Sequence, residues 1–213
     1  MRKIAYTAVF GGYDTPRKPT VKSKGWEYIC FSDRDIKVDG WETVIVPGGK
    51  TPRENILIAR YHKIVFHDHI DCDICLWTDA NIKIQCDLNV FMRKHKTEFF
   101  TMDHPKRTSI YAESVACQHR TEQLLIRQQM EQYVSEHYLA DNGLISSGIL
   151  LRRNNENVRD FCEEWFAELD KYSIRDQLSF NYVLWKHELD LETIPYQELM
   201  SNYFHIRPHK AWK

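Results

Sequence analysis

In the first half of the chain, short apolar runs alternate with short polar segments. Each run is rich in β-branched or aromatic side chains and is bounded by Gly, Pro, Asp or Lys. This composition is typical of β-strands, and the runs are continuous rather than alternating, so they suit a sheet that is covered on both faces. The predicted strands span residues 4–10, 26–31, 42–46 and 74–79.

Helical spacing of apolar residues appears between and after these strands. Residues 51–70 carry apolar side chains at helical spacings with Pro52 near their start, and residues 155–172 place a clear apolar stripe on one face. Strands that alternate with helices and then give way to a mixed second half predict an α/β fold, with a mostly parallel central sheet flanked by helices in a single domain. The remaining predicted elements are helices in 87–95, 109–137 and 173–187 and strands at 82–85, 98–102, 143–151 and 191–195.

Composition narrows the class of protein. The chain has 213 residues, 43% of them hydrophobic, and a formal net charge of -1, which gives a real core and argues against a dedicated nucleic-acid binder. No window is apolar for long enough to span a bilayer, and the N-terminus is predicted to be a strand rather than a signal peptide. The six cysteines fit buried thiols in a reducing cytoplasm.

The stretch "LWTDANI" is the first candidate for chemistry. A hydrophobic run ends at Asp79, and Asn81 follows two positions later, at the carboxyl end of the fourth predicted strand, where α/β sheets bind ligands. Two oxygen-bearing side chains at this spacing can face one hard divalent cation such as Mg²⁺ or Mn²⁺. Asp and Asn are also favoured in turns, so the spacing alone leaves both interpretations open.

Several motifs, including this stretch, occur along the chain in the same order as in a known family of proteins. "WTDANI" resembles the D-x-D element of GT-A-fold glycosyltransferases, with Asn81 in place of the second Asp. The combination "YTAVFGGYD…ICFSD…WTDANI…HP.R…RDQLSF" resembles a GT-A-fold glycosyltransferase-like domain family, formerly a domain of unknown function, with members in bacterial surface-polysaccharide clusters and plant cell-wall proteins. "RDQLSF" and the tail "HIRPHKAWK" are also distantly similar to elements of glycogenin-like transferases.

The resemblance implies a metal site that joins the D-x-N element to the C-terminal tail. Asp79 and Asn81 would be ligands, and His205 and His209 compete for the place of a third. A histidine ligand would tilt the cation from Mg²⁺ toward Mn²⁺. Lys210 would contact the diphosphate.

It also implies a donor-binding set on the first strands and the first helix. The opening strand, which ends near Phe10, would lie under the nucleotide, and Asp14 and Asp33 could hold the base or ribose, although both could simply close turns. Arg60 and Lys63 are three residues apart, so one helix face could present both to the sugar nucleotide or to solvent.

Three residues of the second half complete the predicted site. Asp176 and Gln177 match the "DQ" element near the donor sugar, although Ser173 and Asp176 also fit a capping box. Asp141 and Asp176 are candidates for the carboxylate base that an inverting enzyme would need. Similarity to glycogenin-like elements favours a retaining enzyme, which needs no such base.

We therefore expect a metal-dependent glycosyltransferase that moves a sugar from a nucleotide diphosphate donor, with UDP as the favoured nucleotide, to a glycan or lipid-linked glycan in surface polysaccharide synthesis. Residues 1–102 would form the nucleotide-sugar half, and residues 103–213 would form the acceptor side and the tail. The enzyme would be cytoplasmic and would reach a lipid-linked acceptor by contact with the inner face of the membrane. The alternatives are a metal-dependent hydrolase and a non-catalytic module that binds nucleotide sugars or glycans.

Overall fold

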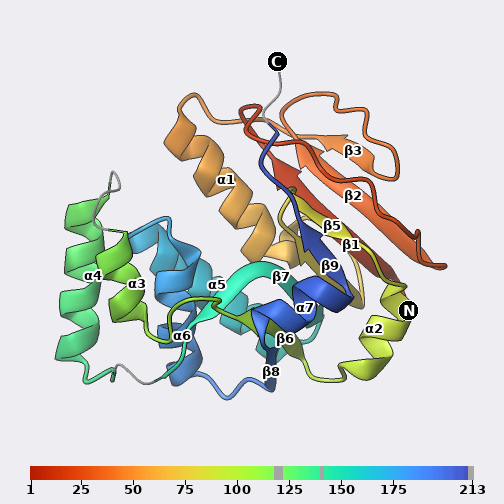
Figure 1. Cartoon of the computed structure of the whole chain (residues 1–213). Helices are drawn as coiled ribbons and strands as arrows, with labels where there is room; N and C mark the ends of the chain where they lie inside the picture. Colours follow the sequence, from red (N-terminus) through yellow and green to blue (C-terminus); the bar gives the residue numbers. More distant parts are fainter. Residues whose placement is uncertain (118–121, 140–141, 211–213) are drawn as a thin grey trace.

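A twisted seven-stranded sheet forms the centre of the protein (Figure 1). The computed structural model describes residues 1–117, 122–139 and 142–210. The strands of this sheet lie in the order β3-β2-β1-β4-β7-β6-β8. Their bounds are β1 Lys3–Val9, β2 Trp26–Ser32, β3 Glu42–Ile45, β4 Ile74–Thr78, β6 Phe99–Asp103, β7 Ile145–Arg153 and β8 Leu191–Ile194.

Strand direction confirms the predicted α/β class. The strands β3, β2, β1 and β4 are mutually parallel, and β8 is parallel to β6. Only β7 runs against both of its neighbours, β4 and β6. The antiparallel β7 brings its residues Ser147 and Gly148 beside the carboxyl end of β4, where Asp79 N donates a hydrogen bond of 2.9 Å to Gly148 O.

Helices cover both faces of the sheet, as Figure 1 shows. One buried cluster packs α1, α5 and α6 against one face, and a second packs α2 and α7 against the other. The Thr51 hydroxyl caps α1 by accepting a hydrogen bond from Glu54 N, with Pro52 as the first helical residue, so the predicted helix start is confirmed. The bounds are α1 Pro52–Ile64, α2 Leu88–Lys94, α3 Ile110–Ala116, α4 Gln123–Ser135, α5 Glu156–Lys171, α6 Asp176–Lys186 and α7 Tyr196–Asn202.

A buried arginine fixes the C-terminal end of α1. Arg152, on β7, is fully buried and donates hydrogen bonds of 3.0 Å to Ile64 O and 2.9 Å to Lys63 O. The Tyr6 hydroxyl also donates to Lys63 O, at 2.9 Å. These bonds satisfy carbonyl groups that a helix end leaves without intrahelical partners. They also hold the backbone of Lys63, whose side chain belongs to the site described below.

The chain end returns to the carboxyl side of β4 through a small second sheet. The strand β5, Ile82–Ile84, follows the Asp79–Asn81 turn and pairs antiparallel with β9, Phe204–Ile206. Because of this pairing, residues 207–210 lie beside the turn. Within the described residues, no helix has the length and apolar character that crossing a membrane requires.

Candidate active site

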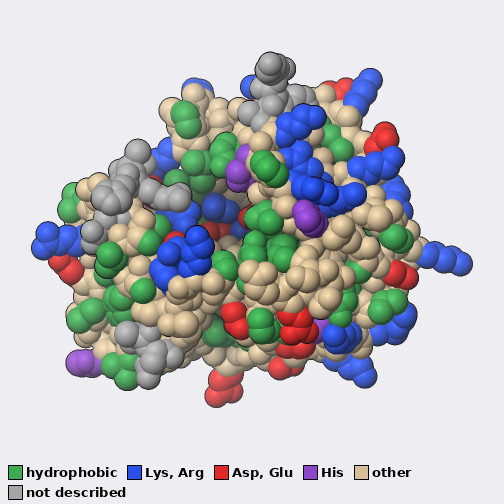
Figure 2. Space-filling view, in the orientation of Figure 1, with side chains coloured by type: hydrophobic (Ala, Val, Ile, Leu, Met, Phe, Trp, Pro, Cys, Tyr) green, Lys and Arg blue, Asp and Glu red, His purple; other side chains and the backbone are tan. Residues whose placement is uncertain are grey.

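A cleft of about 710 Å³ opens at the carboxyl ends of β1 and β4. Its walls come from the end of β1, the loop before α1, α1 itself, the turn after β4, and single residues of the α6 start and the tail. Figure 2 shows this face hollowed near its middle, with basic, acidic and histidine side chains gathered there. The polar residues that the argument below uses are Asp14, Arg60, Asp79, Asn81, Arg175 and His209, all of which line the cleft.

Asp79 lies at the start of the turn that follows β4. Its side chain is 40% exposed, and its Oδ1 accepts a hydrogen bond of 2.9 Å from Trp77 Nε1. The ammonium group of Lys63 lies 3.5 Å from the same oxygen. The other oxygen, Oδ2, lies 3.3 Å from the point where a Cβ at Gly148 would be. The missing side chain of Gly148 therefore leaves room beside Oδ2.

Asn81 joins the turn to the tail. Its residue is 7% exposed, its Nδ2 donates a hydrogen bond of 3.2 Å to Arg207 O, and Arg207 N donates to Asn81 O at 2.8 Å. An aspartate has no N–H with which to reach the Arg207 carbonyl. This contact gives a physical reason for Asn in place of the second Asp of D-x-D, and it leaves the amide oxygen of Asn81 for a ligand.

Beneath the cleft lies a buried network of opposite charges. Lys63 and Asp176 are 1% and 3% exposed in their side chains, and Lys63 Nζ donates to Asp176 Oδ2 at 2.6 Å. Ser147 Oγ donates to the same oxygen at 2.7 Å, and Arg60 Nη1 lies 3.2 Å from it. One carboxylate therefore receives two cations and a hydroxyl, which satisfies the requirement that buried charges be paired.

This environment sets the protonation state of Asp176. Burial alone would raise its pKa, but the charges of Arg60 and Lys63, with the hydrogen bonds from Lys63 and Ser147, outweigh burial and hold the pKa well below its usual range. The carboxylate is therefore ionised and is a weak base. In this structure it pairs with Arg60 and Lys63 and so fixes the positions of both side chains.

The tail is fastened at the rim of the cleft by Asp14, which is 3% exposed. Asp14 Oδ2 lies 2.5 Å from His209 Nδ1, and Asp14 Oδ1 accepts a hydrogen bond of 3.0 Å from Lys210 N. Arg17 binds the carbonyl of Pro208 and lies 3.6 Å from Asp14 Oδ1. His209 is thereby held in the cleft lining, with its side chain 53% exposed.

Comparison with known proteins identifies the family of the chain. The family model of the TOD1/MUCI70 glycosyltransferase-like domain matches residues 32–205. The chain belongs to this family. A search of curated proteins found no match. The matched range includes β4, the Asp79–Asn81 turn and the start of α6, so the resemblance inferred from the sequence motifs is confirmed at the level of the family.

Membership of the TOD1/MUCI70 family makes a glycosyltransferase-type function the coarse assignment for this chain, with a sugar donor and an acceptor as its ligands. The family match gives no role for any single residue, so the roles have to be inferred from the geometry of the cleft. Asp79, Asn81, His209 and Arg60, all predicted for the site, come together in the cleft lining.

The other predicted residues of the first half line the cleft or lie close to it. Phe10 and Asp14 line it, but Asp14 contacts the tail. Asp33 accepts a hydrogen bond of 3.0 Å from Gly11 N and so braces the loop after β1, while its neighbour Arg34 lines the cleft. Lys63 is buried, unlike Arg60 on the same helix, and reaches Asp79 and Asp176 from below.

The remaining predicted residues fall elsewhere. His205 lies in β9 opposite Lys83, outside the described lining of the cleft. Gln177 Oε1 accepts a hydrogen bond of 3.0 Å from Arg175 Nη2. Lys210 is exposed, and its backbone, rather than its side chain, makes its contacts with Asp14 and Thr15. Asp141 lies outside the described residues.

Several residues of the site escaped prediction. Trp77 had a local signal, because residues two apart in a strand share a face, which puts its side chain beside Asp79. Arg175 directly precedes the "DQ" element and lines the cleft. Ser147 and Gly148 lie in a predicted strand, but their contacts with Lys63, Asp176 and Asp79 join distant parts of the chain and have no local sequence signal.

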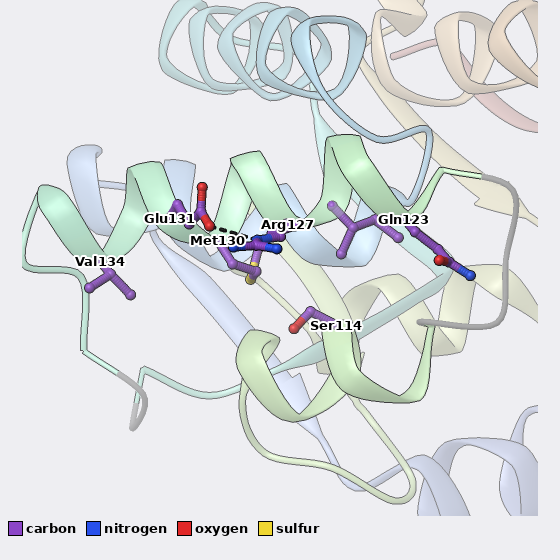
Figure 3. A pocket seen from close by; sticks show the side chains of 7 residues that line it. Ser114, Gln123, Arg127, Met130, Glu131 and Val134 are labelled. Atoms are coloured by element: carbon purple, nitrogen blue, oxygen red, sulfur yellow. Dashed lines mark hydrogen bonds and ion pairs between the residues drawn. The ribbon is translucent and has the colours of Figure 1, made fainter.

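A second hollow, of about 700 Å³, lies between α3 and α4 on the outer side of the molecule. Figure 3 shows its lining, which comes almost entirely from α4, with Ser114 from α3. We refer to it as the α4 groove, lined by Ser114, Gln123, Ile126, Arg127, Met130, Glu131 and Val134.

Proposed function

We propose that this protein is a metal-dependent glycosyltransferase that moves a sugar from a nucleoside diphosphate donor, with UDP as the favoured nucleotide, to a glycan or lipid-linked glycan. The observation that carries the proposal is the convergence of Asp79, Asn81 and His209 in one cleft at the carboxyl end of β4. These side chains come from a strand end, a turn and a tail. They meet where α/β sheets bind ligands, in a chain of the glycosyltransferase-like family.

The donor set at this point fits a hard or borderline divalent cation. Asp79 Oδ2 has room beside it because residue 148 is glycine, the amide oxygen of Asn81 is left by its Nδ2 contact, and His209 presents its ring to the cleft. We propose these three residues as the ligands of Mn²⁺ or Mg²⁺, with His209 rather than His205 as the tail histidine. When bound, the cation would neutralise charge on the diphosphate and so make it a better leaving group.

The protein's own residues would do the rest of the work. Arg60 lines the cleft and is oriented by Asp176, so it can hold a phosphate oxygen of the donor. Lys63 supports Asp79 from below and is too buried to meet the donor directly. Phe10 offers an apolar surface to the base, and the tail lysine Lys210 is proposed to reach the diphosphate from the rim.

The state of Asp176 argues against this residue as the base of an inverting reaction, and a retaining reaction is proposed from the similarity to glycogenin-like elements. An inverting transfer needs a carboxylate that can take a proton from the acceptor hydroxyl. Asp176 is 2% exposed, and its low pKa, set against burial by Arg60 and Lys63, makes it a poor proton acceptor. We propose that Asp176 orients cations around the donor, with Gln177 placed beside it through Arg175.

The hydrolase alternative lacks a comparable observation. A hydrolytic zinc site uses three protein ligands and one open position. Among the described residues, no three His, Cys, Asp or Glu side chains form such a group. The transferase proposal does not need three of these types, because an amide oxygen and diphosphate oxygens complete the shell. The proposed role in polysaccharide synthesis follows the sequence resemblance, and the proposed setting at the cytoplasmic face of a membrane follows the six cysteines, which fit buried thiols in a reducing compartment.

The test is release of nucleoside diphosphate from a panel of nucleotide sugars, with Mn²⁺, with Mg²⁺ and with chelator. We expect metal-dependent release from at least one donor, lowered about 100-fold or more in Asp79→Ala because several kcal/mol of charge stabilisation is lost. Asp71→Ala is the matched control, since the Asp71 side chain is 98% exposed and remote from the cleft lining. Donor affinity without release would indicate a binding module, and absence of both would contradict the proposal.

A further inference from the structure

Two arginines are held by one buried carboxylate at the α6 end of the cleft. Glu113, on α3, has a side chain that is 2% exposed and accepts hydrogen bonds from Arg107 Nε and, at 3.0 Å, from Arg175 Nη2. Arg107 follows β6, and Arg175 directly precedes α6. Three segments of the second half of the chain are thus joined through Glu113, which we refer to, with its two arginines, as the Glu113 cluster.

The Glu113 cluster has an excess of positive charge. The two guanidinium groups and the one carboxylate leave one positive charge, and the Asp176 carboxylate, which also acts on Arg175, is already paired with Arg60 and Lys63. His104 does not change this sum, because its Nδ1 accepts hydrogen bonds from Lys106 N at 3.3 Å and Arg107 N at 3.0 Å. A ring nitrogen that accepts is unprotonated, so His104 is neutral here.

Glu113 binds only part of each guanidinium group. The Arg107 and Arg175 side chains remain 29% and 20% exposed, respectively. Arg175 Nη2 also donates to Gln177, while Arg175 Nε is buried and has no hydrogen-bond partner in the described part of the chain. A buried donor without a partner is costly, and a bound ligand or water is the usual way to satisfy it.

The position of the Glu113 cluster shows where such a ligand would extend. Arg175 lines the cleft, whereas Arg107 lies outside its described lining. A ligand that meets both arginines therefore begins in the cleft and continues toward α3. The proposed metal ligands Asp79 and Asn81 belong to the half of the chain that is predicted to bind the nucleotide sugar, whereas Arg107 belongs to the half that is predicted to face the acceptor, so we assign a ligand that reaches Arg107 to the acceptor side.

We propose that Arg107 and Arg175, positioned by Glu113, bind an acidic group of the acceptor, so that the acceptor is an anionic glycan. The group is a carboxylate or a phosphate, since a guanidinium fork matches both. This inference rests on the proposed function and adds the chemical class of its acceptor. Glu113 is a positioning residue, and the two arginines make the contact.

The test is binding of defined probes by calorimetry, with and without UDP and Mn²⁺. The probes are an oligomer of a hexuronic acid, a sugar 1-phosphate and a neutral oligomer of matched length. We expect at least one acidic probe to bind more tightly than the neutral one and to weaken with salt. Arg107→Gln and Arg175→Gln should each lower that affinity about 10-fold or more, as loss of a charge-assisted hydrogen bond does.

The Glu113→Gln variant tests the positioning role. It should weaken the acidic probe by several-fold and leave UDP affinity unchanged, and Arg107→Gln keeps the test valid if Glu113→Gln fails to fold. Arg127→Gln on α4 is the matched control, because the Arg127 side chain is 78% exposed and pairs only with Glu131 among the described residues. That variant should bind all probes as the wild type does.

Several results would overturn the inference. Equal affinity for acidic and neutral probes, or no binding of any probe, would show that the Glu113 cluster is structural. A loss of UDP affinity in Arg175→Gln without a change for the acidic probe would assign Arg175 to the donor. These outcomes are distinct from failure of the proposed function, which shows as absence of UDP binding by the wild type, because acidic probes are also measured without nucleotide.

Discussion

The cleft beside β4 and the α4 groove have nearly the same volume, about 710 and 700 Å³, and very different chemistry. The cleft gathers charged side chains from segments that lie far apart in the sequence. The α4 groove is lined almost entirely by one helix, and its ion pair joins Arg127 to Glu131, one turn apart and 78% and 61% exposed. Such a pair contributes a few tenths of a kcal/mol to stability.

The difference lies in what supports the surface residues. Under the cleft, buried groups hold the exposed ones, as Lys63 holds Asp79 and Asp176 holds Arg60. Under the α4 groove, Gln129 and Tyr133 are fully buried, and the one partner to which Gln129 donates in the described ranges is Tyr133, at 2.8 Å. A preorganised site needs buried polar groups that hold its exposed side chains in place, as they do under the cleft. Convergent and supported polar groups, rather than volume, therefore identify the candidate active site.

The largest expected effect comes from removal of the buried cation under the cleft. Lys63→Met should lower the free energy of unfolding by about 3 kcal/mol, because it leaves the buried Asp176 with Arg60 as its one remaining ion-pair partner among the described residues. Arg127→Met in the α4 groove should change it by less than about 0.5 kcal/mol. Chemical denaturation with both variants measures the contrast. Equal effects would contradict the distinction between the two regions.

The strands and helices that carry the cleft residues could largely be predicted from the sequence. The contacts between residues far apart in the chain could not. Apolar runs and spacing predicted α1 and the strand β4 that leads into Asp79, since these depend on local pattern. The burial of Lys63 could not be predicted, because its partner Asp176 is 113 residues away. The same holds for the role of Asn81, which depends on the return of the tail through β9.

Acid should weaken the α1 wall of the cleft. The rings of His62 and His69 stack at 4.0 Å, and His62 lies 5.3 Å from Phe10 in the cleft lining. Burial, with the nearby His62, lowers the pKa of His69 to about 4, and burial also lowers the pKa of His62. The unfolded chain binds protons more readily than the folded one between pH 6.5 and 4, so stability falls across this window as pH decreases.

The expected loss is about 2 kcal/mol between pH 6.5 and 4, allowing for partial exposure of His69. Denaturation at a series of pH values measures it, with His69→Phe as the comparison, since a ring that cannot take a proton removes part of the dependence. An identical pH profile in His69→Phe would show that other groups cause the acid effect.

Asn81→Asp separates the two roles of this residue. The change removes the donor to Arg207 O and places a carboxylate beside that carbonyl, so the free energy of unfolding should fall by about 1–2 kcal/mol. The added charge should tighten Mn²⁺ binding at the same time. Denaturation measures the loss of the contact with Arg207, and metal titration measures the change in Mn²⁺ affinity. Unchanged metal affinity would argue against Asn81 as a ligand.

Among the changes made in the cleft, Gly148→Ala has the smallest expected effect on stability. The new Cβ would lie 3.0 Å from Ile82 Cδ1 and 3.3 Å from Asp79 Oδ2, a crowding that the higher strand propensity of alanine offsets. Stability should change by less than about 1 kcal/mol, whereas metal-dependent nucleotide binding should weaken, because the space beside Oδ2 is filled. Normal binding in this variant would show that the space is not used.

The most direct test of the account is a thermal-shift measurement with UDP and Mn²⁺ on the wild type, Asp79→Ala in the cleft and Arg127→Ala in the α4 groove. A ligand at 100 times its Kd adds about 2.7 kcal/mol to the stability of the folded state, so binding raises Tm. We predict a metal-dependent rise in the wild type, the same rise in Arg127→Ala and none in Asp79→Ala. No rise in the wild type, or a rise that survives Asp79→Ala and disappears in Arg127→Ala, would contradict the assignment of the nucleotide site to the cleft beside β4.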